Sequence, residues 1–314
     1  MKQRVVVDRM VSRQWESGLR EVFAPGTLLN RVRAVSAAAL NLQALESIHT
    51  RSTYLEDHGI RFLVHMASSL RRKPPHDAHR NPFLPYETAL YVADASASHA
   101  CILNKYNVVD LHLLIVTRKF EHQESLVTEG DFRALWRCLL EYESLGFYNS
   151  GITSGASQMH KHLQVVPLPL VPNGSPREAP IEPLLDNARG CPGTILESRD
   201  LPFAHSLVFW DPAQVSDAAL MAQCSLNCYT QMLRRHALEP TSGARVSGAY
   251  NLLVTRRWML FVPRVRECFE SISCNSLAFA GTLLVHDVAQ MERLRAAGPL
   301  AALEAVAAPR RDLE

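Results

Sequence analysis

The densest group of side chains able to do chemistry lies in residues 154–167. The second half of this stretch reads as a strand, and alternate side chains of a strand share one face, so His160, His162 and Gln164 are predicted to point the same way. The preceding residues, 154–158, supply two hydroxyls, an amide and a glycine, which suits a loop whose backbone N–H groups gather around phosphate oxygens. A basic imidazole beside such a loop is the arrangement needed to attack a phosphorus atom.

An imidazole attacks phosphorus only in its neutral form. At an ordinary pKa of about 6.5 a histidine is largely neutral at pH 7, and one ring nitrogen then holds a free lone pair. The other nitrogen must carry the proton and donate it to an acceptor, so that the ring is aimed. The spacing leaves two other interpretations open. The two histidines could be hydrogen-bonded inside a polar core, or they could bind a metal with Gln164 as a poor third ligand.

Hydrophobic periodicity predicts the elements that hold this strand. Residues 1–80 read as helices and loops, ending in a basic, proline-bounded turn at Arg71–Pro75. The helices expected in the first half are Val11–Phe23, Leu28–Leu45 and Glu129–Leu145. The strands expected there are Ala89–Ala93, Ala100–Val109, His112–Thr117 and Met159–Pro167. We expect the second and third of these strands to be antiparallel neighbours, because only a short break separates them.

Residues 167–202 are rich in proline and mark the best candidate for a domain boundary. We therefore predict an N-terminal domain at 1–170, a linker at 171–202 and a C-terminal domain at 203–314. The elements expected in the last part are a strand at Ser206–Trp210, a helix at Ser216–Arg235, a hairpin of Tyr250–Thr255 with Trp258–Val262, and a helix at Asp287–Ala307. Strands and helices do not alternate strictly, so an α+β fold with an antiparallel sheet and flanking helices is favoured over a doubly wound parallel one.

Composition excludes several classes of protein. The chain has 314 residues, 47% of them hydrophobic, and a formal net charge of +2, so it has no overall positive field to hold a nucleic acid. The sequence has no apolar run of about 18 residues, so no membrane span is predicted. The N-terminus lacks the apolar core of a signal peptide. The seven cysteines are scattered without a Cys-x-x-Cys pair, which is typical of reduced thiols in a cytoplasmic protein.

The stretch His160–Pro167 resembles the His-x-His-x-Gln signature of the histidine-triad superfamily, in its branch of diadenosine tetraphosphate (Ap4A) phosphorylases, or ATP adenylyltransferases. Further stretches resemble blocks of that family in the same order along the chain. They are Asn81–Pro85, Leu103–Val109, His112–Phe120, Tyr250–Met259 and Asn275–Gly281. The resemblance implies a histidine-triad-like sheet in the N-terminal part and an ATP adenylyltransferase domain in the C-terminal part.

The resemblance also implies an activity. The family cleaves Ap4A with phosphate to ADP and ATP, and runs the reverse adenylyl transfer, through an AMP bonded to the second histidine of the signature. That residue is His162 here. His160 would orient it, and Gln164 stands where hydrolytic relatives carry a third histidine. The substrate-binding residues implied by the family are Lys73, Asn104, Lys105, Asn149, Ser154, Gly155, Ala156, Ser157, Gln158, Ser273 and Asn275. Strand alternation points Lys161 away from the histidine face, so we predict that it does not bind phosphate.

The implied partners are dinucleoside polyphosphates, ATP, ADP and phosphate, without nucleic acid or membrane, and we expect a monomer. A divalent cation, Mg²⁺, is expected to ride on the nucleotide phosphates rather than in a dedicated protein site. A hexose-1-phosphate uridylyltransferase is the alternative enzyme, although that family favours proline where Lys161 stands. A non-catalytic nucleotide sensor is the alternative from another class. The sequence assigns no role to Arg256, Arg257 or His112, and the last of these is interpreted as structural.

Overall fold

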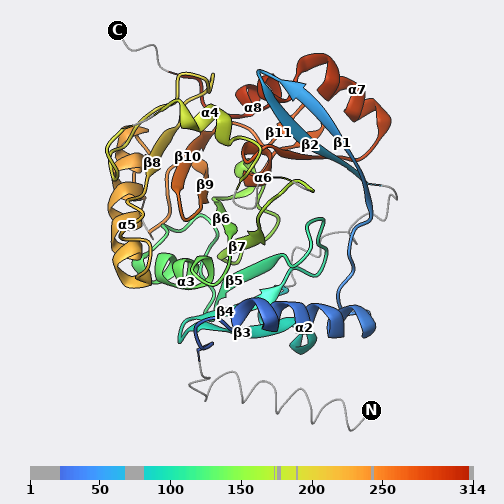
Figure 1. Ribbon diagram of the computed structural model, residues 1–314, viewed down its shortest axis with the longest axis vertical. Coiled ribbons are helices and arrows are strands. Elements are labelled where there is room, and N and C mark those ends of the chain that lie inside the picture. Colours follow the sequence, from blue (N-terminus) through green and yellow to red (C-terminus); the bar gives the residue numbers. More distant parts are fainter. Residues whose placement is uncertain are drawn as a thin grey trace.

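Eight strands form one antiparallel sheet that runs through the molecule (Figure 1). The computed structural model describes residues 22–67, 81–172, 174, 178–188, 190–241 and 244–310. Across the sheet the order is β3-β4-β5-β7-β6-β9-β10-β8, and every neighbouring pair is antiparallel. The strands are β3 (Tyr91–Ser96), β4 (His99–Leu103), β5 (Leu113–Thr117), β6 (Ser144–Asn149), β7 (His162–Pro167), β8 (Ser206–Phe209), β9 (Ala249–Val254) and β10 (Trp258–Arg264). The predicted α+β class with an antiparallel sheet is confirmed.

The sheet is continuous across the two halves of the chain. β6 from the first half pairs with β9 from the second, so the division predicted at 171–202 does not separate two sheets. That segment is also more than a linker, because it contains helix α4 (Glu182–Asp186) and buries Ile181 and Leu185 completely. These side chains join a core with residues of both halves. The prolines therefore mark a change in composition rather than a gap in packing.

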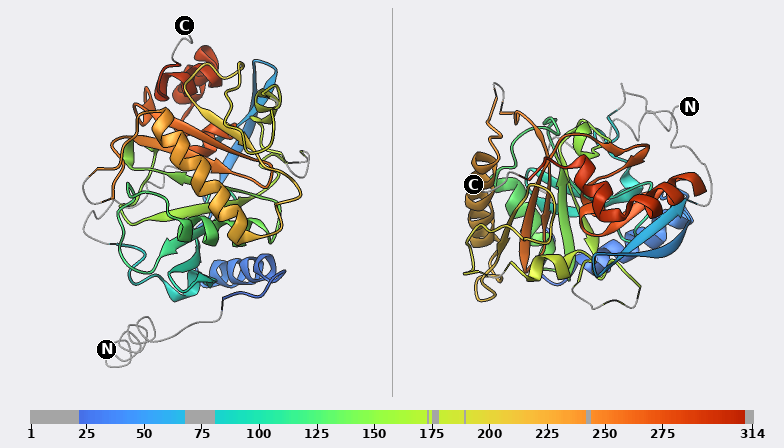
Figure 2. Two further views of the ribbon diagram at one scale, coloured as in Figure 1. Left: turned by 90° about the vertical axis from the view of Figure 1, so that its left-hand side faces the viewer. Right: turned by 90° about the horizontal axis from the view of Figure 1, so that it is seen from above.

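Two helices cover one face of the sheet (Figure 2). They are α3 (Glu129–Leu139) and α5 (Ala218–Arg235), which pack on each other. A capping box starts α3, since the Thr128 hydroxyl accepts from the N–H of Asp131 while the Asp131 carboxylate accepts from the N–H of Thr128. α3 ends six residues before the predicted helix end at Leu145, because residues 144–149 form β6 instead. Helix α2 (Leu28–Asn41) packs on β3 at the sheet's edge.

A second, three-stranded sheet lies on the opposite face, and none of its strands was predicted from the sequence (Figure 1). It consists of β1 (Thr50–Asp57), β2 (Ile60–Ala67) and β13 (Thr282–Val285), where the first pair is antiparallel and the second parallel. The expectation of only helices and loops in residues 1–80 is therefore wrong. His58 and Gly59 both have positive φ, as the two-residue hairpin turn between β1 and β2 requires.

The C-terminal helix is also divided. Instead of one helix at Asp287–Ala307 there are two, α7 (Val288–Ala297) and α8 (Pro299–Val306). Gly298 lies between them with φ of +88°, and a Cβ there would come within 2.9 Å of a carboxylate oxygen of Asp57. The remaining short elements are η1 (Thr88–Leu90), η2 (Ile152–Ser154), β11 (Cys268–Phe269), β12 (Ile272–Ser273) and α6 (Ser276–Phe279). None of the helices in the described ranges is long and apolar enough to cross a membrane.

Most other predicted elements are confirmed within a few residues. The predicted helix at Val11–Phe23 and the turn at Arg71–Pro75 fall almost entirely outside the described residues. The strand expected at Ala100–Val109 ends at Leu103, and the hairpin of β9 and β10 forms as predicted. On β7 the apolar side chains Leu163 and Val165 face α3, in the same core as its Leu135. The histidine face is therefore the other one.

Candidate active site

His162 begins β7 and is only 4% exposed. Its Nδ1 lies 2.8 Å from the carbonyl oxygen of His160, which can only accept a hydrogen bond, so Nδ1 carries the proton. The lone pair then lies on Nε2, and this atom has no hydrogen-bond partner among the described residues. The ring of Phe83 packs against the imidazole at 5.2 Å between centroids. The ring is therefore held in one tautomer, with its basic nitrogen unused.

The protonation state of His162 follows from its burial. Loss of water around the ring lowers its pKa from 6.5 to about 4; the hydrogen bond to the His160 carbonyl opposes this shift, and the charge of the His160 ring adds a smaller lowering. At pH 7 the imidazole is therefore neutral. A neutral ring with Nδ1–H fixed and Nε2 unprotonated is the form that nucleophilic attack requires.

His160 has both ring nitrogens occupied. Its Nε2 lies 2.8 Å from the carbonyl oxygen of Thr117, and its Nδ1 lies 2.9 Å from the side-chain nitrogen of Asn81. His160 therefore donates through Nε2 and accepts through Nδ1, and burial lowers its pKa as well. With no free nitrogen, its ring is not placed to bind phosphate. It orients His162 through its own backbone carbonyl, which accepts the Nδ1–H of that residue.

Gln123 completes the backbone pairing of His162. The register of β6 with β7 ends at the pair Phe147–Gln164, before it reaches His162. The side-chain oxygen of Gln123 accepts from the N–H of His162 at 2.8 Å, and its nitrogen donates to the carbonyl oxygens of His162 and Asn149. An amide side chain thus replaces a missing strand partner beside the candidate nucleophile.

Lys161 lies on the opposite face of the strand, as predicted from alternation. Its ammonium is completely buried and donates to Asp131 at 2.6 Å, to the carbonyl of Leu126 at 2.7 Å and to Glu121 at 3.1 Å. Asp131 also accepts from His99 at 2.8 Å. Burial alone would raise the pKa of Asp131, but the hydrogen bond from His99 and the charge of Lys161 outweigh it and hold that pKa below its usual range. This buried ion pair fastens β7 to α3.

The loop before β7 turns twice through positive φ. Gly151 and Gly155 both have φ of +86°, which favours glycine. A Cβ on Gly155 would also lie 2.8 Å from the Cβ of Asn275, so the structure brings together two residues that the family resemblance implies for substrate binding. Ala156 and Gln158 are partly exposed and Ser157 is exposed, so this end of the loop is accessible to a ligand.

Ser154 and Asn149 serve the architecture of this loop. The Ser154 hydroxyl is buried and donates to the carbonyl of Gly151 at 2.8 Å. The side-chain oxygen of Asn149 accepts from Asn251 at 2.8 Å and from the hydroxyl of Ser276 at 2.7 Å. These contacts join the loop and β6 to the second half of the chain.

The other implied substrate-binding residues are spread over several elements. Asn104 contacts His112, and Lys105 donates to Glu87 at 2.6 Å. Ser273 donates to Glu267 at 2.8 Å, and the Asn275 side chain caps α6 by accepting from the N–H of Leu277. Lys73 lies outside the described residues.

Arg264 holds the site's loops together, a role that no local sequence pattern predicted. Its guanidinium is 6% exposed and donates to the carbonyls of Cys274 at 2.8 Å and Val306 at 3.1 Å, and more weakly to that of Ser154. Burial lowers its pKa to about 10, still well above neutrality. Its bonds to the carbonyls of Ser154 and Val306 join residues far apart in sequence, so no local pattern indicates them. Asn81 and Asn251 each lie in one of the quoted family blocks, which is the signal that could have found them.

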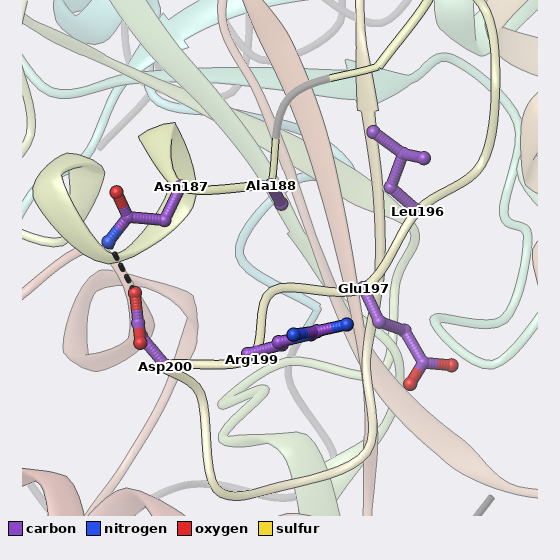
Figure 3. Close-up of a pocket in the computed structure, with 6 residues that line it drawn as sticks. All are labelled: Asn187, Ala188, Leu196, Glu197, Arg199 and Asp200. Carbon is purple, nitrogen blue, oxygen red and sulfur yellow. Dashed lines mark hydrogen bonds between the residues drawn. The ribbon is translucent and has the colours of Figure 1, made fainter.

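A pocket elsewhere contains none of the predicted residues. Figure 3 shows it, with Asn187 donating a hydrogen bond to Asp200 across its mouth. It is lined by Asn187, Ala188, Leu196, Glu197, Arg199 and Asp200. Among the described residues of the whole chain, no group of three or more His, Cys, Asp or Glu side chains is suited to hold a metal ion. The histidine face of β7 therefore remains the candidate active site.

The fold is α+β with an antiparallel sheet, and His-x-His-x-Gln lies at the start of its central strand β7. The second histidine is neutral, and one of its nitrogens has no partner among the described residues. These features define a histidine-triad-like protein. Comparison with known proteins narrows this class. Residues 19–187 match the family model of the Ap4A phosphorylase N-terminal domain, and residues 199–309 match that of the ATP adenylyltransferase C-terminal domain. The chain belongs to the Ap4A phosphorylase family.

Individual relatives agree with this assignment. The chain is 28% identical over 288 residues to diadenosine 5′,5‴-P1,P4-tetraphosphate phosphorylase 2 of Saccharomyces cerevisiae, covering 80% of this chain and 84% of that protein. It is 27% identical over 208 residues to protein APA1 of the same yeast, covering 60% and 61%. The crystal structure of yeast Ap4A phosphorylase Apa2 superposes with a TM-score of 0.75 at 24% identity, covering 94% of this chain and 98% of that one. This structural likeness shows a shared fold.

Proposed function

We propose that the protein cleaves Ap4A with inorganic phosphate to ADP and ATP, reversibly, through an AMP covalently bonded to His162. Family membership supports this activity, as does the similarity to the yeast phosphorylase relative. Yeast Ap4A phosphorylase Apa2 in complex with Ap4A has the same fold. The observation that carries the proposal is the buried, neutral imidazole of His162, whose Nδ1 proton is held by the carbonyl of His160.

The reaction consists of two displacements at one phosphorus. In the first, Nε2 of His162 attacks an α-phosphorus of Ap4A, a P–N bond forms, the bond to the bridging oxygen breaks, and ATP leaves. In the second, an oxygen of inorganic phosphate attacks the same phosphorus, the P–N bond breaks, and ADP leaves. Each step inverts the phosphorus, so retention of configuration is expected overall. Neutral His162 is regenerated without a net change in its protonation.

The negative oxygens must be neutralised while these bonds change. We propose that the backbone N–H of Gln158 and the side-chain amide of Gln164 supply donors, since the N–H groups of Gly155 and Ala156 already donate to the carbonyls of Ile152 and Gly151. A divalent cation, Mg²⁺, would enter already bound to the phosphates, whose oxygens would be its ligands. Its positive charge would offset part of their negative charge. The chain's own contribution is to hold the polyphosphate in line with Nε2 of His162.

The experiment measures products and the intermediate together. Purified protein is incubated with Ap4A labelled in one adenylate, with and without phosphate, and the labelled peptide is mapped by mass spectrometry. We expect ADP and ATP only with phosphate, and without it a label on His162 that His162→Asn abolishes. His205 is a control in the same chain, because its Nδ1 also donates to a carbonyl two residues earlier, at 2.8 Å, but its Nε2 already accepts from the N–H of Ser198. It should stay unlabelled.

Other outcomes identify other functions. Release of AMP without phosphate would make the protein a hydrolase. Binding of Ap4A without any label or product would make it a nucleotide sensor. Turnover of UDP-glucose with galactose-1-phosphate would make it a uridylyltransferase.

We also propose that the protein works in the cytoplasm as a monomer, without binding nucleic acid or membrane. All seven cysteines are free thiols, which suits a reducing compartment. The net charge of +2 gives no reason to expect binding to a polyanionic surface. Light scattering after size-exclusion chromatography would test the monomer, since a dimer would double the mass of 35.1 kDa.

A further inference from the structure

Three side chains form a hydrogen-bonded series behind the candidate site. The side-chain nitrogen of Asn104 lies 3.2 Å from Nδ1 of His112, and Nε2 of His112 lies 2.9 Å from the side-chain oxygen of Gln164. The oxygen of the Asn104 side chain accepts from the N–H of Tyr106, so its nitrogen is the atom that faces His112. His112 therefore accepts at Nδ1 and carries its proton on Nε2, which it donates to Gln164.

The backbone fixes this series in place. His112 precedes β5, where Leu114 pairs with Gln164, so His112 is a diagonal neighbour of Gln164 on the same face of the sheet. The N–H of Asn104 donates to the carbonyl of His112 at 2.9 Å, and the His112 ring packs 5.8 Å from that of Phe147. His112 is only 7% exposed, so its ring has little contact with water.

The orientation of the Gln164 amide follows from this contact. Since its oxygen accepts from His112, its NH₂ group lies on the other side of the amide, and among the described residues that group has no hydrogen-bond partner. Gln164 shares the strand face of His162, two residues away. An NH₂ group donates to phosphoryl oxygens, whereas a rotated amide would present its oxygen to them and repel them.

We propose that His112 is a positioning residue that sets the amide of Gln164 with its NH₂ group toward the transferred phosphoryl group. This inference rests on the proposed adenylyl transfer. It also gives Asn104 a different role from direct substrate binding, because Asn104 sets the tautomer of His112. The oxygen and the NH₂ group of a glutamine side chain exchange places by a simple rotation when no neighbour distinguishes them. The hydrogen-bonded series therefore fixes an orientation that Gln164 lacks by itself.

Two variants of His112 separate positioning from packing. His112→Phe keeps a ring against Phe147 but removes the donor, whereas His112→Gln keeps an N–H donor of similar reach. We expect His112→Phe to lower the rate of ATP release from bound Ap4A about 10- to 100-fold, part of the loss known for a missing oxyanion donor, with KM changed less than about threefold. His112→Gln should recover most of the rate. In a Gln164→Ala background, His112→Phe should have no further effect.

The outcomes distinguish this inference from the proposed function. An active wild type with an unaffected His112→Phe variant, or with an equal loss in the Gln164→Ala background, would overturn the positioning role. A wild type unable to transfer adenylate would refute only the proposed function. The series itself is then judged by ¹⁵N NMR of the histidine rings in the wild-type protein. The inference requires His112 in the Nε2–H tautomer, and a spectrum showing the Nδ1–H tautomer would overturn it.

Discussion

The buried imidazole of His162 predicts that adenylation remains fast well below the ordinary histidine pKa. Burial lowers the pKa of His162 from 6.5 to about 4. At pH 5.5 a histidine with a pKa of 6.5 would be only about 9% neutral, whereas one with a pKa of 4 would be about 97% neutral. Because only the neutral ring attacks phosphorus, the rate at pH 5.5 should stay within about twofold of the rate at pH 7.5.

The assay must avoid other groups that titrate in this range. Ap4A has no terminal phosphate, so its charge stays constant between these pH values, and inorganic phosphate is left out. The measurement is ATP release in a single turnover at sub-saturating Ap4A, which reports ionisation of the free enzyme. Near-UV circular dichroism at each pH checks that the protein is folded, and His162→Asn gives the background. A rate that falls about tenfold with a midpoint near pH 6.5 would refute the reasoning.

Two further predictions concern the supports of the site. Lys161→Met should lower the free energy of unfolding by about 3–5 kcal/mol, because it leaves the Asp131 carboxylate buried without its ammonium partner, while His162→Asn should abolish turnover and change stability little. Urea unfolding and turnover per folded molecule measure both effects. Gly155→Ala should raise KM for Ap4A at least about fivefold, because alanine would be strained at this φ and its Cβ would clash with Asn275. Gly193→Ala is the control, since Gly193 has φ of +79° but open space around it. This variant should lower the free energy of unfolding by about 1 kcal/mol and leave KM unchanged.

Each prediction has an outcome that contradicts it. If folded Lys161→Met protein lost turnover as completely as His162→Asn, the conclusion that Lys161 takes no direct part in the reaction would be wrong. Equal KM values for the two glycine variants would show that the close approach of Gly155 to Asn275 does not shape the substrate site.

The lowered pKa of Asp131 gives a pH test of the same buried pair. A carboxyl whose folded pKa lies below its ordinary 3.8 stabilises the fold above that pH and loses this contribution as the pH falls through the folded value. Asp131→Asn should therefore remove part of the stability difference between pH 7 and pH 3, measured by urea unfolding. An unchanged difference would show that Asp131 contributes nothing to acid sensitivity. Ser225→Ala, at a buried neutral hydroxyl, is a control that should keep the pH dependence.

Local patterns predicted the parts of the site that local geometry decides. Strand alternation alone separated Lys161 from His162, and the hydrogen bonds of both residues confirm it. The hairpin of β1 and β2 was missed, although Asp57–Ile60 contains a His-Gly turn of the type that joins two strands. One reason is that β1 is half-exposed and contains charged residues, so its apolar signal is weak.

Contacts between residues far apart in the sequence could not be predicted from local patterns. Asn149 is hydrogen-bonded to Asn251 and Ser276, more than a hundred residues away, and no residue spacing indicates such a contact. The same holds for Arg264 and the carbonyl of Ser154. The family resemblance named Asn149 and Asn275 for substrate binding, but it could not tell whether their side chains touch a ligand or hold the loop. In the structure the Asn149 side chain bonds Asn251 and Ser276, and the Asn275 side chain caps α6.

These long-range contacts argue that the two family segments form one catalytic unit. The loop that precedes His162 belongs to the first segment, yet its carbonyl at Ser154 is held by Asn251 and Arg264 of the second. The sheet joins them again at β6 and β9. At the start of β7, Lys161 is bonded to Asp131 of α3, while the next residue, His162, lies on the other face. The second segment therefore does more than enlarge the protein, because without it the loop that precedes His162 would lose the hydrogen bonds that hold it in place.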